Sequence, residues 1–382
     1  MSQTSPCSSP WTDFTSTHEK IREELEKAIE EYVIKGNKGI DAPVIVAPFG
    51  SGKTTLLRHL LCFSISQGIP AIKINLSYLV KFLEFQNKKF DESTLYQDIE
   101  EFCKRIIKII IYCLDKSQKQ DCSDIISNII VQDENIKKYN KKGRKDNKKE
   151  ETIKDFRNII QDIINEFAIL SADTQKVIEV LRKFTEGNSK CVLLIDEVEE
   201  NYEELKKIVK YKTTPFRGVF DKVHDNATLV FPILAFGPSS IYSEVVSSAG
   251  SWRTSQYVLP MINPLNVGQI IRQRNIDQIF DTYISYISNL IWWIGKGRPG
   301  HVHKVINQIL LGDKIQNVIQ DTLSGCKSIL DTEWAKSLQD TYVVENIPYI
   351  EQKEYTNIEE KKLNDSDEKN LFHILSILVG PV

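Results

Sequence analysis

Short apolar runs alternate along the chain with amphipathic segments, which is the pattern of a sheet covered by helices. Five runs rich in β-branched residues predict strands at residues 43–47, 71–76, 191–195, 229–236 and 256–262. Because these runs are apolar with little alternation, both faces of each strand are expected to be buried. The chain is therefore predicted to be an α/β protein with a parallel five-stranded sheet and helices on both faces.

The same pattern divides the chain into segments of different character. Residues 1–15 are polar and are expected to be disordered, and residues 16–265 hold the five strands. A long helical stretch at about 78–189 separates the second and third strands and is interpreted as an insertion. Residues 266–340 have a helical pattern, which predicts a lid. The remaining residues, 341–382, form a polar tail or the start of a truncated further domain.

A basic segment lies inside the predicted insertion. Residues 132–151 hold eight basic and five acidic side chains and almost no apolar ones, which is typical of a solvated loop. A nuclear import signal and a contact with an anionic surface are the alternatives. Without this segment, 41 basic residues face 47 acidic ones, so the rest of the chain has no global positive field for nucleic acid.

The composition favours an intracellular protein of the cytoplasm or nucleus. No apolar run is long enough to span a bilayer, and the amino terminus lacks the pattern of a signal peptide. The seven cysteines are scattered and include no C-x-x-C pair, so a zinc ribbon is not expected.

The loop after the first predicted strand has the pattern of a phosphate-binding loop. It fits G-x-x-x-x-G-K-[ST] except that Ala47 replaces the first glycine. Gly50 and Gly52 allow backbone N–H groups to turn toward a phosphate, and the helix that follows adds its partial positive charge. Lys53 is expected to reach the outer phosphates, and the Thr54 hydroxyl is expected to bind magnesium. The expected nucleotide-binding residues are Pro48, Phe49, Gly50, Ser51, Gly52, Lys53, Thr54 and Thr55.

Two carboxylates follow the third predicted strand, in the sequence C-V-L-L-I-D-E. Side chains at the carboxyl end of a parallel strand lie at the ligand-binding edge of the sheet. Asp196 is therefore expected to hold magnesium, and Glu197 to orient or deprotonate an attacking water. Together with the phosphate-binding loop, these acids predict a site for ATP and Mg²⁺.

These motifs resemble those of the AAA+ and STAND group of P-loop ATPases, particularly the origin-recognition-like branch. The resemblance covers about residues 21–310. It includes two later segments, V-L-P-M-I-N-P-L-N at 258–266, which is similar to the strand and turn leading into the lid, and G-K-G-R-P-G-H at 295–301, which is similar to a lid motif. The ATPase modules of Crinkler-type effectors are similar as well.

The resemblance implies roles for two arginines. A lid arginine of this group often contacts the γ-phosphate, but Gly300 stands at the usual position here, so Arg298 is the substitute candidate. An arginine ahead of the fifth strand often reaches a neighbouring subunit's nucleotide, which makes Arg253 a candidate finger or else a surface arginine. The γ-phosphate sensor after the fourth strand has only Ser239 and Ser240 as candidates.

The predicted function is ATP hydrolysis with magnesium that drives a conformational or assembly change. The alternative is a nucleotide-gated interaction or effector protein with slow or no hydrolysis. No N-K-x-D guanine motif and no L-S-G-G-Q transporter signature occurs. Besides ATP, the expected partners are other copies of the chain, in a homo-oligomer, and a macromolecule, protein or nucleic acid, that the sequence does not name; no membrane partner is expected.

Overall fold

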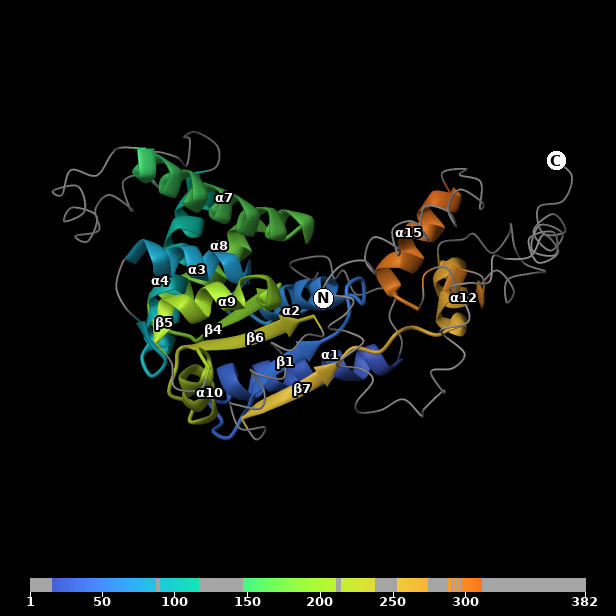
Figure 1. Ribbon diagram of the computed structural model, residues 1–382, viewed down its shortest axis with the longest axis horizontal. Helices are drawn as coiled ribbons and strands as arrows, with labels where there is room; N and C mark the ends of the chain where they lie inside the picture. Colours follow the sequence, from blue (N-terminus) through green and yellow to red (C-terminus); the bar gives the residue numbers. More distant parts are fainter. Residues whose placement is uncertain are drawn as a thin grey trace, which may run out of the picture.

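The computed structural model describes residues 16–86, 90–116, 147–210, 214–237, 253–273, 288–289, 291–292, 295 and 297–310. Five parallel strands form one sheet in the order β2-β4-β6-β1-β7 (Figure 1). The strands are β1 (Ala42–Val46), β2 (Ala71–Asn75), β4 (Cys191–Asp196), β6 (Val230–Phe236) and β7 (Thr254–Val258). The predicted parallel α/β fold is confirmed, and each strand lies within a few residues of its predicted range.

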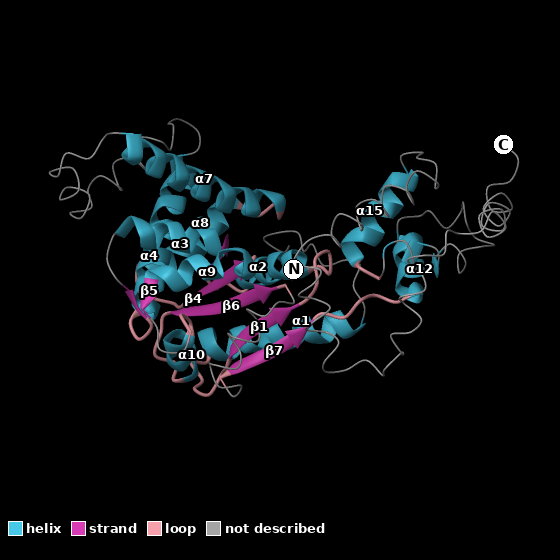
Figure 2. Cartoon of the chain, in the orientation of Figure 1, coloured by secondary structure: helices cyan, strands magenta, loops and turns pink. Residues whose placement is uncertain are grey.

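Helices cover both faces of the sheet, as predicted. The connection from β1 to β2 carries α2 (Lys53–Ser66), whereas the connection from β4 to β6 carries α9 (Val198–Ile208) and α10 (Arg217–His224). These two crossovers run in opposite directions along the sheet, because the strand order places β2 on one side of β1 and places β6 on the other side of β4. Figure 2 shows the magenta strands with helices packed around them. Because parallel crossovers are right-handed, α2 lies on one face and α9 and α10 lie on the other.

The amino-terminal helix α1 (Ser16–Ile29) continues into a π-helical turn, η1 (Glu30–Ile34), and packs on α2. Tyr32 in this turn is fully buried, stacks on Phe231 of β6 and donates a 2.9 Å hydrogen bond to the Thr228 carbonyl. This segment thereby closes the core against the start of β6.

The register of the sheet brings the carboxyl ends of the strands together. Asn75, the last residue of β2, pairs with Asp196, the last residue of β4. Val46 at the end of β1 pairs with Phe236 at the end of β6. In Figure 1 the arrowheads of β1, β6 and β7 all point toward the region of α12 and α15. Groups that follow these strands therefore meet at one edge of the sheet.

The predicted insertion packs on the main core. Between β2 and β4 lie α3 (Leu76–Gln86), β3 (Phe90–Asp91), α4 (Leu95–Lys116), α7 (Asn147–Ile169) and α8 (Thr174–Thr185). β3 pairs with β5 (Val209–Lys210) in a second, two-stranded sheet. The apolar faces of α4 and α7, through residues such as Phe102 and Ile160, belong to the same hydrophobic cluster as the main sheet. The basic segment lies mostly outside the described residues, and its end, from Asn147, is helical.

A second hydrophobic cluster follows the fifth strand. It includes residues of α12 (Pro264–Gln273) and α15 (Pro299–Leu310). Its members are Ile262, Val267, Ile270, Ile271, Ile291, Val302, Val305 and Ile306, with Trp292 packed against them. The Trp292 indole donates a 2.7 Å hydrogen bond to the Ile262 carbonyl, which ties the turn after β7 to this cluster. Residues 1–15 and 311–382, which include the predicted disordered start, the end of the predicted lid and the predicted tail, lie outside the described residues.

None of the helices in the described part of the chain combines the length and the apolar character that crossing a membrane requires.

Candidate functional site

The loop between β1 and α2 curls at the carboxyl edge of the sheet. Gly50 and Gly52 have positive φ angles of 77° and 99°, which side chains rarely tolerate. The Ser51 amide donates to the Pro48 carbonyl at 3.2 Å, and α2 begins at Lys53 directly after the turn. The two glycines are therefore required by the backbone path, which turns the loop over the positive end of α2.

Lys53 folds back over this loop. Its Nζ donates to the carbonyl oxygens of Ala47, at 2.6 Å, and Pro48, at 3.3 Å. Burial lowers the pKa of Lys53 below its usual range, while the carboxylates at the end of β4 and the start of α9 favour the charged form. The ammonium group is thus held at the loop by weak, replaceable acceptors, and a phosphate would be a stronger one.

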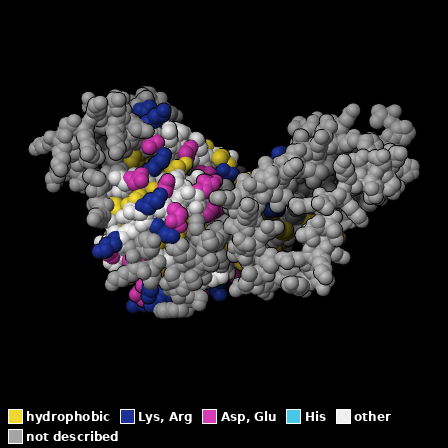
Figure 3. Space-filling view, viewed as in Figure 1, with side chains coloured by type: hydrophobic (Ala, Val, Ile, Leu, Met, Phe, Trp, Pro, Cys, Tyr) yellow, Lys and Arg dark blue, Asp and Glu magenta, His cyan; other side chains and the backbone are white. Residues whose placement is uncertain are grey.

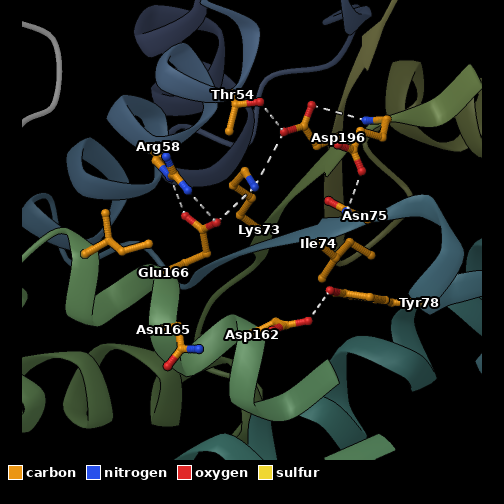
Figure 4. A pocket seen from close by; sticks show the side chains of 12 residues that line it. Thr54, Arg58, Lys73, Ile74, Asn75, Tyr78, Asp162, Asn165, Glu166 and Asp196 are labelled. Atoms are coloured by element: carbon orange, nitrogen blue, oxygen red, sulfur yellow. Dashed lines mark hydrogen bonds and ion pairs between the residues drawn. The ribbon is translucent and has the colours of Figure 1, made fainter. Parts of the chain in front are cut away.

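Thr54 and Asp196, the two predicted magnesium ligands, are in direct contact. The Thr54 hydroxyl donates a 2.7 Å hydrogen bond to Asp196 Oδ2 (Figure 4). The other carboxylate oxygen, Oδ1, accepts from the Glu197 amide at 3.1 Å. Asp196 is only 3% exposed, so its charge acts in a poorly solvated environment. The structure therefore places the end of β4 against the first turn of α2.

Glu197 occupies a left-handed backbone conformation, with φ 54° and ψ 43°, which is uncommon for a residue with a Cβ. Its carboxylate accepts a 2.6 Å hydrogen bond from the Asn75 side-chain amide. Burial, followed by the charges of Glu200 and Asp196, raises the pKa of the Glu197 carboxyl. A less acidic carboxylic acid is a stronger base once ionised, which suits proton transfer.

Sequence reasoning missed Asn75 and a buried network beside it. Glu166 of α7 accepts from Arg58 Nε at 2.7 Å and from Lys73 Nζ at 3.2 Å, and Lys73 Nζ also lies 3.5 Å from Asp196 Oδ2. These side chains line a pocket of about 370 Å³ between α7 and the end of β4 (Figure 4). The available signal was a lysine in the middle of the apolar strand A-I-K-I-N, because a buried cation requires a partner.

The segment that resembles a lid motif reaches the loop. The Gly300 amide donates a 2.8 Å hydrogen bond to the Gly50 carbonyl, and the His301 ring lies 6.2 Å from the Phe49 ring, edge to face. Arg298 lies two residues before Gly300. Its positive charge contributes to the lowered pKa of Lys53, so the two cations are near one another. Arg298 is thus near the loop, and its contact with a γ-phosphate stays a prediction.

Arg253 lies elsewhere. Its carbonyl accepts from the Ala42 amide at the start of β1, so it stands at the amino edge of the sheet, remote from the loop. Its guanidinium forms an ion pair with Asp221 of α10. At this position Arg253 is too remote to contact a nucleotide bound at the loop of its own chain. Its contact with the nucleotide of a neighbouring subunit stays a prediction. Ser239 and Ser240 lie outside the described residues.

The donor set fits magnesium bound together with a nucleotide. In the described part of the chain no group of three His, Cys, Asp or Glu side chains is arranged to hold a metal by itself. Magnesium is commonly bound by one or two protein oxygens, water and substrate phosphates. One hydroxyl and one buried carboxylate beside a phosphate-binding loop match that requirement.

Comparison with known proteins adds little to this geometry. No protein-family model matches the chain, and no curated protein matches it. One similar solved structure is the Aeropyrum pernix ORC1 protein in complex with DNA, at 12% identity and a TM-score of 0.32. The match covers 70% of this chain and 51% of that one, so it spans about half the length of the archaeal protein. A similarity this low carries no argument about function, which therefore rests on the residues themselves.

The backbone of the loop gives a first prediction. Gly50→Ala should destabilise the fold by about 1–2 kcal/mol, because alanine resists positive φ and its methyl group would come within 3.1 Å of the His301 ring. Ser51→Ala is the matched control, since the buried Ser51 hydroxyl has no hydrogen-bond partner among the described residues. Urea unfolding measures both, and equal stabilities for the two variants would contradict the strained loop.

Proposed function

We propose that the protein binds ATP with magnesium at the loop 47–55 and hydrolyses it. The observation that carries this proposal is the 2.7 Å hydrogen bond between Thr54 and Asp196. The two residues are 142 positions apart, and each was expected to bind magnesium for an independent reason. Their contact beside a glycine turn and a helix amino terminus forms a site for a metal-bound triphosphate.

Each residue then has a role in the reaction. The loop amides and Lys53 bind and orient the phosphates, while Thr54 and Asp196 hold the metal. Magnesium, when bound, neutralises charge that develops on the phosphate oxygens. Glu197 stands beside this position and accepts a proton from the attacking water, or orients that water. Exclusion of bulk water by the surrounding core strengthens these electrostatic interactions.

A nucleotide-gated switch with slow hydrolysis is the second candidate. The hydrogen bond from Asn75 engages one oxygen of the Glu197 carboxylate, Oε2, and restrains the orientation in which the group can accept a water. With Glu197 held in this way, the protein would hydrolyse ATP slowly until Asn75 releases the carboxylate. Measuring phosphate release and nucleotide binding on the same sample separates the two candidates, since a switch binds tightly but turns over slowly.

The lid region supports a nucleotide-dependent motion. Residues 266–340 are proposed to form a lid. Its described residues share with Ile262 a hydrophobic cluster that is separate from the main cluster of the 16–265 core. The Gly300–Gly50 hydrogen bond joins the lid to the loop that would hold phosphate, so nucleotide binding would move it. This arrangement is the basis for proposing membership of the AAA+ and STAND group, with assembly or conformational change as the output.

The partners are proposed from charge alone. The face shown in Figure 3 mixes acidic and basic side chains on its described part, and the net charge of the chain is −3. This favours a homo-oligomer or a protein partner inside the cell over nucleic acid held by a broad basic surface.

Lys53→Ala should weaken nucleotide binding by about 10- to 100-fold, since a charge-assisted hydrogen bond contributes roughly 1.5–3 kcal/mol. The fold should survive, because within the described part of the chain the Lys53 side chain donates hydrogen bonds only to loop carbonyls. Titration of a fluorescent ATP analogue in the presence of magnesium measures the affinity. Lys81→Ala, at an exposed ion pair on α3, is the matched control. Equal affinities for both variants would remove the loop assignment.

Glu197→Gln should keep nucleotide binding and lower the hydrolysis rate by about 10²- to 10⁴-fold, because the amide retains the shape but cannot accept a proton. Glu204→Gln is the control, since the same charge is removed from an exposed position further along α9. A Glu197→Gln rate equal to that of an active wild type would exclude Glu197 as the base. A wild type that binds but does not hydrolyse would favour the switch.

Arg253→Ala should bind ATP normally and, if the site is shared between subunits, hydrolyse it 10³- to 10⁵-fold more slowly. Mixing it with Glu197→Gln should then restore part of the activity, because some interfaces would join an intact Glu197 to an intact Arg253. Asp221→Asn, which removes the partner of Arg253 within its own chain, tests whether that ion pair matters by itself. No recovery on mixing would leave Arg253 as an ordinary ion-paired surface residue.

A further inference from the structure

Lys73 is a buried cation next to the proposed magnesium ligand. It is 6% exposed and comes from the middle of β2, where its neighbours along the strand are apolar. Its Nζ makes a hydrogen bond to Glu166 at 3.2 Å and lies at ion-pair distance, 3.5 Å, from Asp196 Oδ2. The same Oδ2 atom accepts the hydrogen bond from Thr54. Lys73 is therefore shared between one carboxylate that would bind metal and one that would not.

Glu166 is held firmly in place by α2. Arg58 donates to both of its carboxylate oxygens, at 2.7 and 3.1 Å. Burial alone would raise the pKa of the Glu166 carboxyl, but the hydrogen bonds and charges of Arg58 and Lys73 outweigh that effect and lower it. Glu166 thus stays ionised and anchors Lys73 from the side opposite Asp196 (Figure 4).

The four charged side chains of Arg58, Lys73, Glu166 and Asp196 have no net charge together. Arg58 and Lys73 contribute two positive charges, and Glu166 and Asp196 contribute two negative ones. A positive charge that turned fully to Asp196 would compete with a divalent cation for that carboxylate. In a poorly solvated site such competition is strong, because charges a few ångströms apart are only weakly screened.

We propose that Glu166 is a positioning residue that sets the magnesium affinity of the nucleotide site by holding Lys73 back from Asp196. This inference rests on the proposed function. Because Glu166 belongs to α7, the helical insertion between β2 and β4 controls how readily the site takes up metal. A partner that shifted α7 would change magnesium affinity without touching the phosphate-binding loop.

The test uses the full chain and a fluorescent ADP analogue. Binding is measured over a magnesium titration and again in EDTA, which separates metal affinity from nucleotide affinity. Glu166→Gln should raise the magnesium concentration for half-maximal effect on the order of tenfold, since one unit of positive charge is gained near the metal. Its affinity in EDTA should stay the same or become tighter. Asp162→Asn, one turn earlier on α7 and bonded to Tyr78 instead, should match the wild type.

Lys73→Met gives the opposite and independent expectation. It removes the competing cation while Glu166 keeps both bonds to Arg58, so folding should be retained. The magnesium requirement should fall below that of the wild type. The double variant Lys73→Met with Glu166→Gln should stay within about threefold of Lys73→Met alone, because Glu166 acts on the metal site only through Lys73.

The magnesium requirements of the two variants support or overturn the role of Glu166. An unchanged magnesium requirement in Glu166→Gln, or a raised one in Lys73→Met, would overturn the inference while leaving nucleotide binding intact. If Glu166→Gln does not fold, Lys73→Met decides alone. A wild type whose nucleotide binding does not depend on magnesium at all would instead overturn the proposed function, and this inference with it.

Discussion

The hydrogen bond between Thr54 and Asp196 is the constraint on which the site depends. It joins the first turn of α2 to the end of β4, although β6 separates β4 from β1 in the sheet. The contact forms only because the parallel register ends the strands at one edge, where the loop after β1 curls back over α2. The fold is thus the means by which the oxygens of two distant residues, both predicted magnesium ligands, are brought within 2.7 Å of each other.

From this point the site extends in two directions. On one side the insertion supplies Glu166, which reaches Asp196 through the shared Lys73. On the other side Gly300, at the start of α15, donates a hydrogen bond to the Gly50 carbonyl of the loop. A bound nucleotide and its metal would therefore be linked to both regions, to the insertion through Lys73 and to α15 through the loop. The proposed conversion of phosphate chemistry into movement of these regions rests on these two links.

The sequence predicted the strands well because buried parallel strands are continuous apolar runs, such as V-L-L-I before Asp196, and these are visible without any alignment. It did not predict the strand order, since no local pattern states which strands are neighbours. The phosphate-binding loop was predicted because its residues follow a fixed spacing, and Asp196 and Glu197 were predicted because they directly follow an apolar strand. Asn75, Lys73 and Glu166 were missed because their partners lie about 90 to 120 residues away and only the folded sheet brings them together. The charged residue inside A-I-K-I-N was a usable signal that a buried anion had to exist nearby.

The most direct test of the Thr54–Asp196 site is a crystal structure of the full chain with a non-hydrolysable ATP analogue and Mn²⁺, with the metal located by anomalous scattering. We expect the β- and γ-phosphates within the loop 47–55 and the metal about 2.1 Å from the Thr54 hydroxyl oxygen, with Asp196 bound directly or through water. A nucleotide bound elsewhere, or a metal remote from both Thr54 and Asp196, would contradict the proposed site.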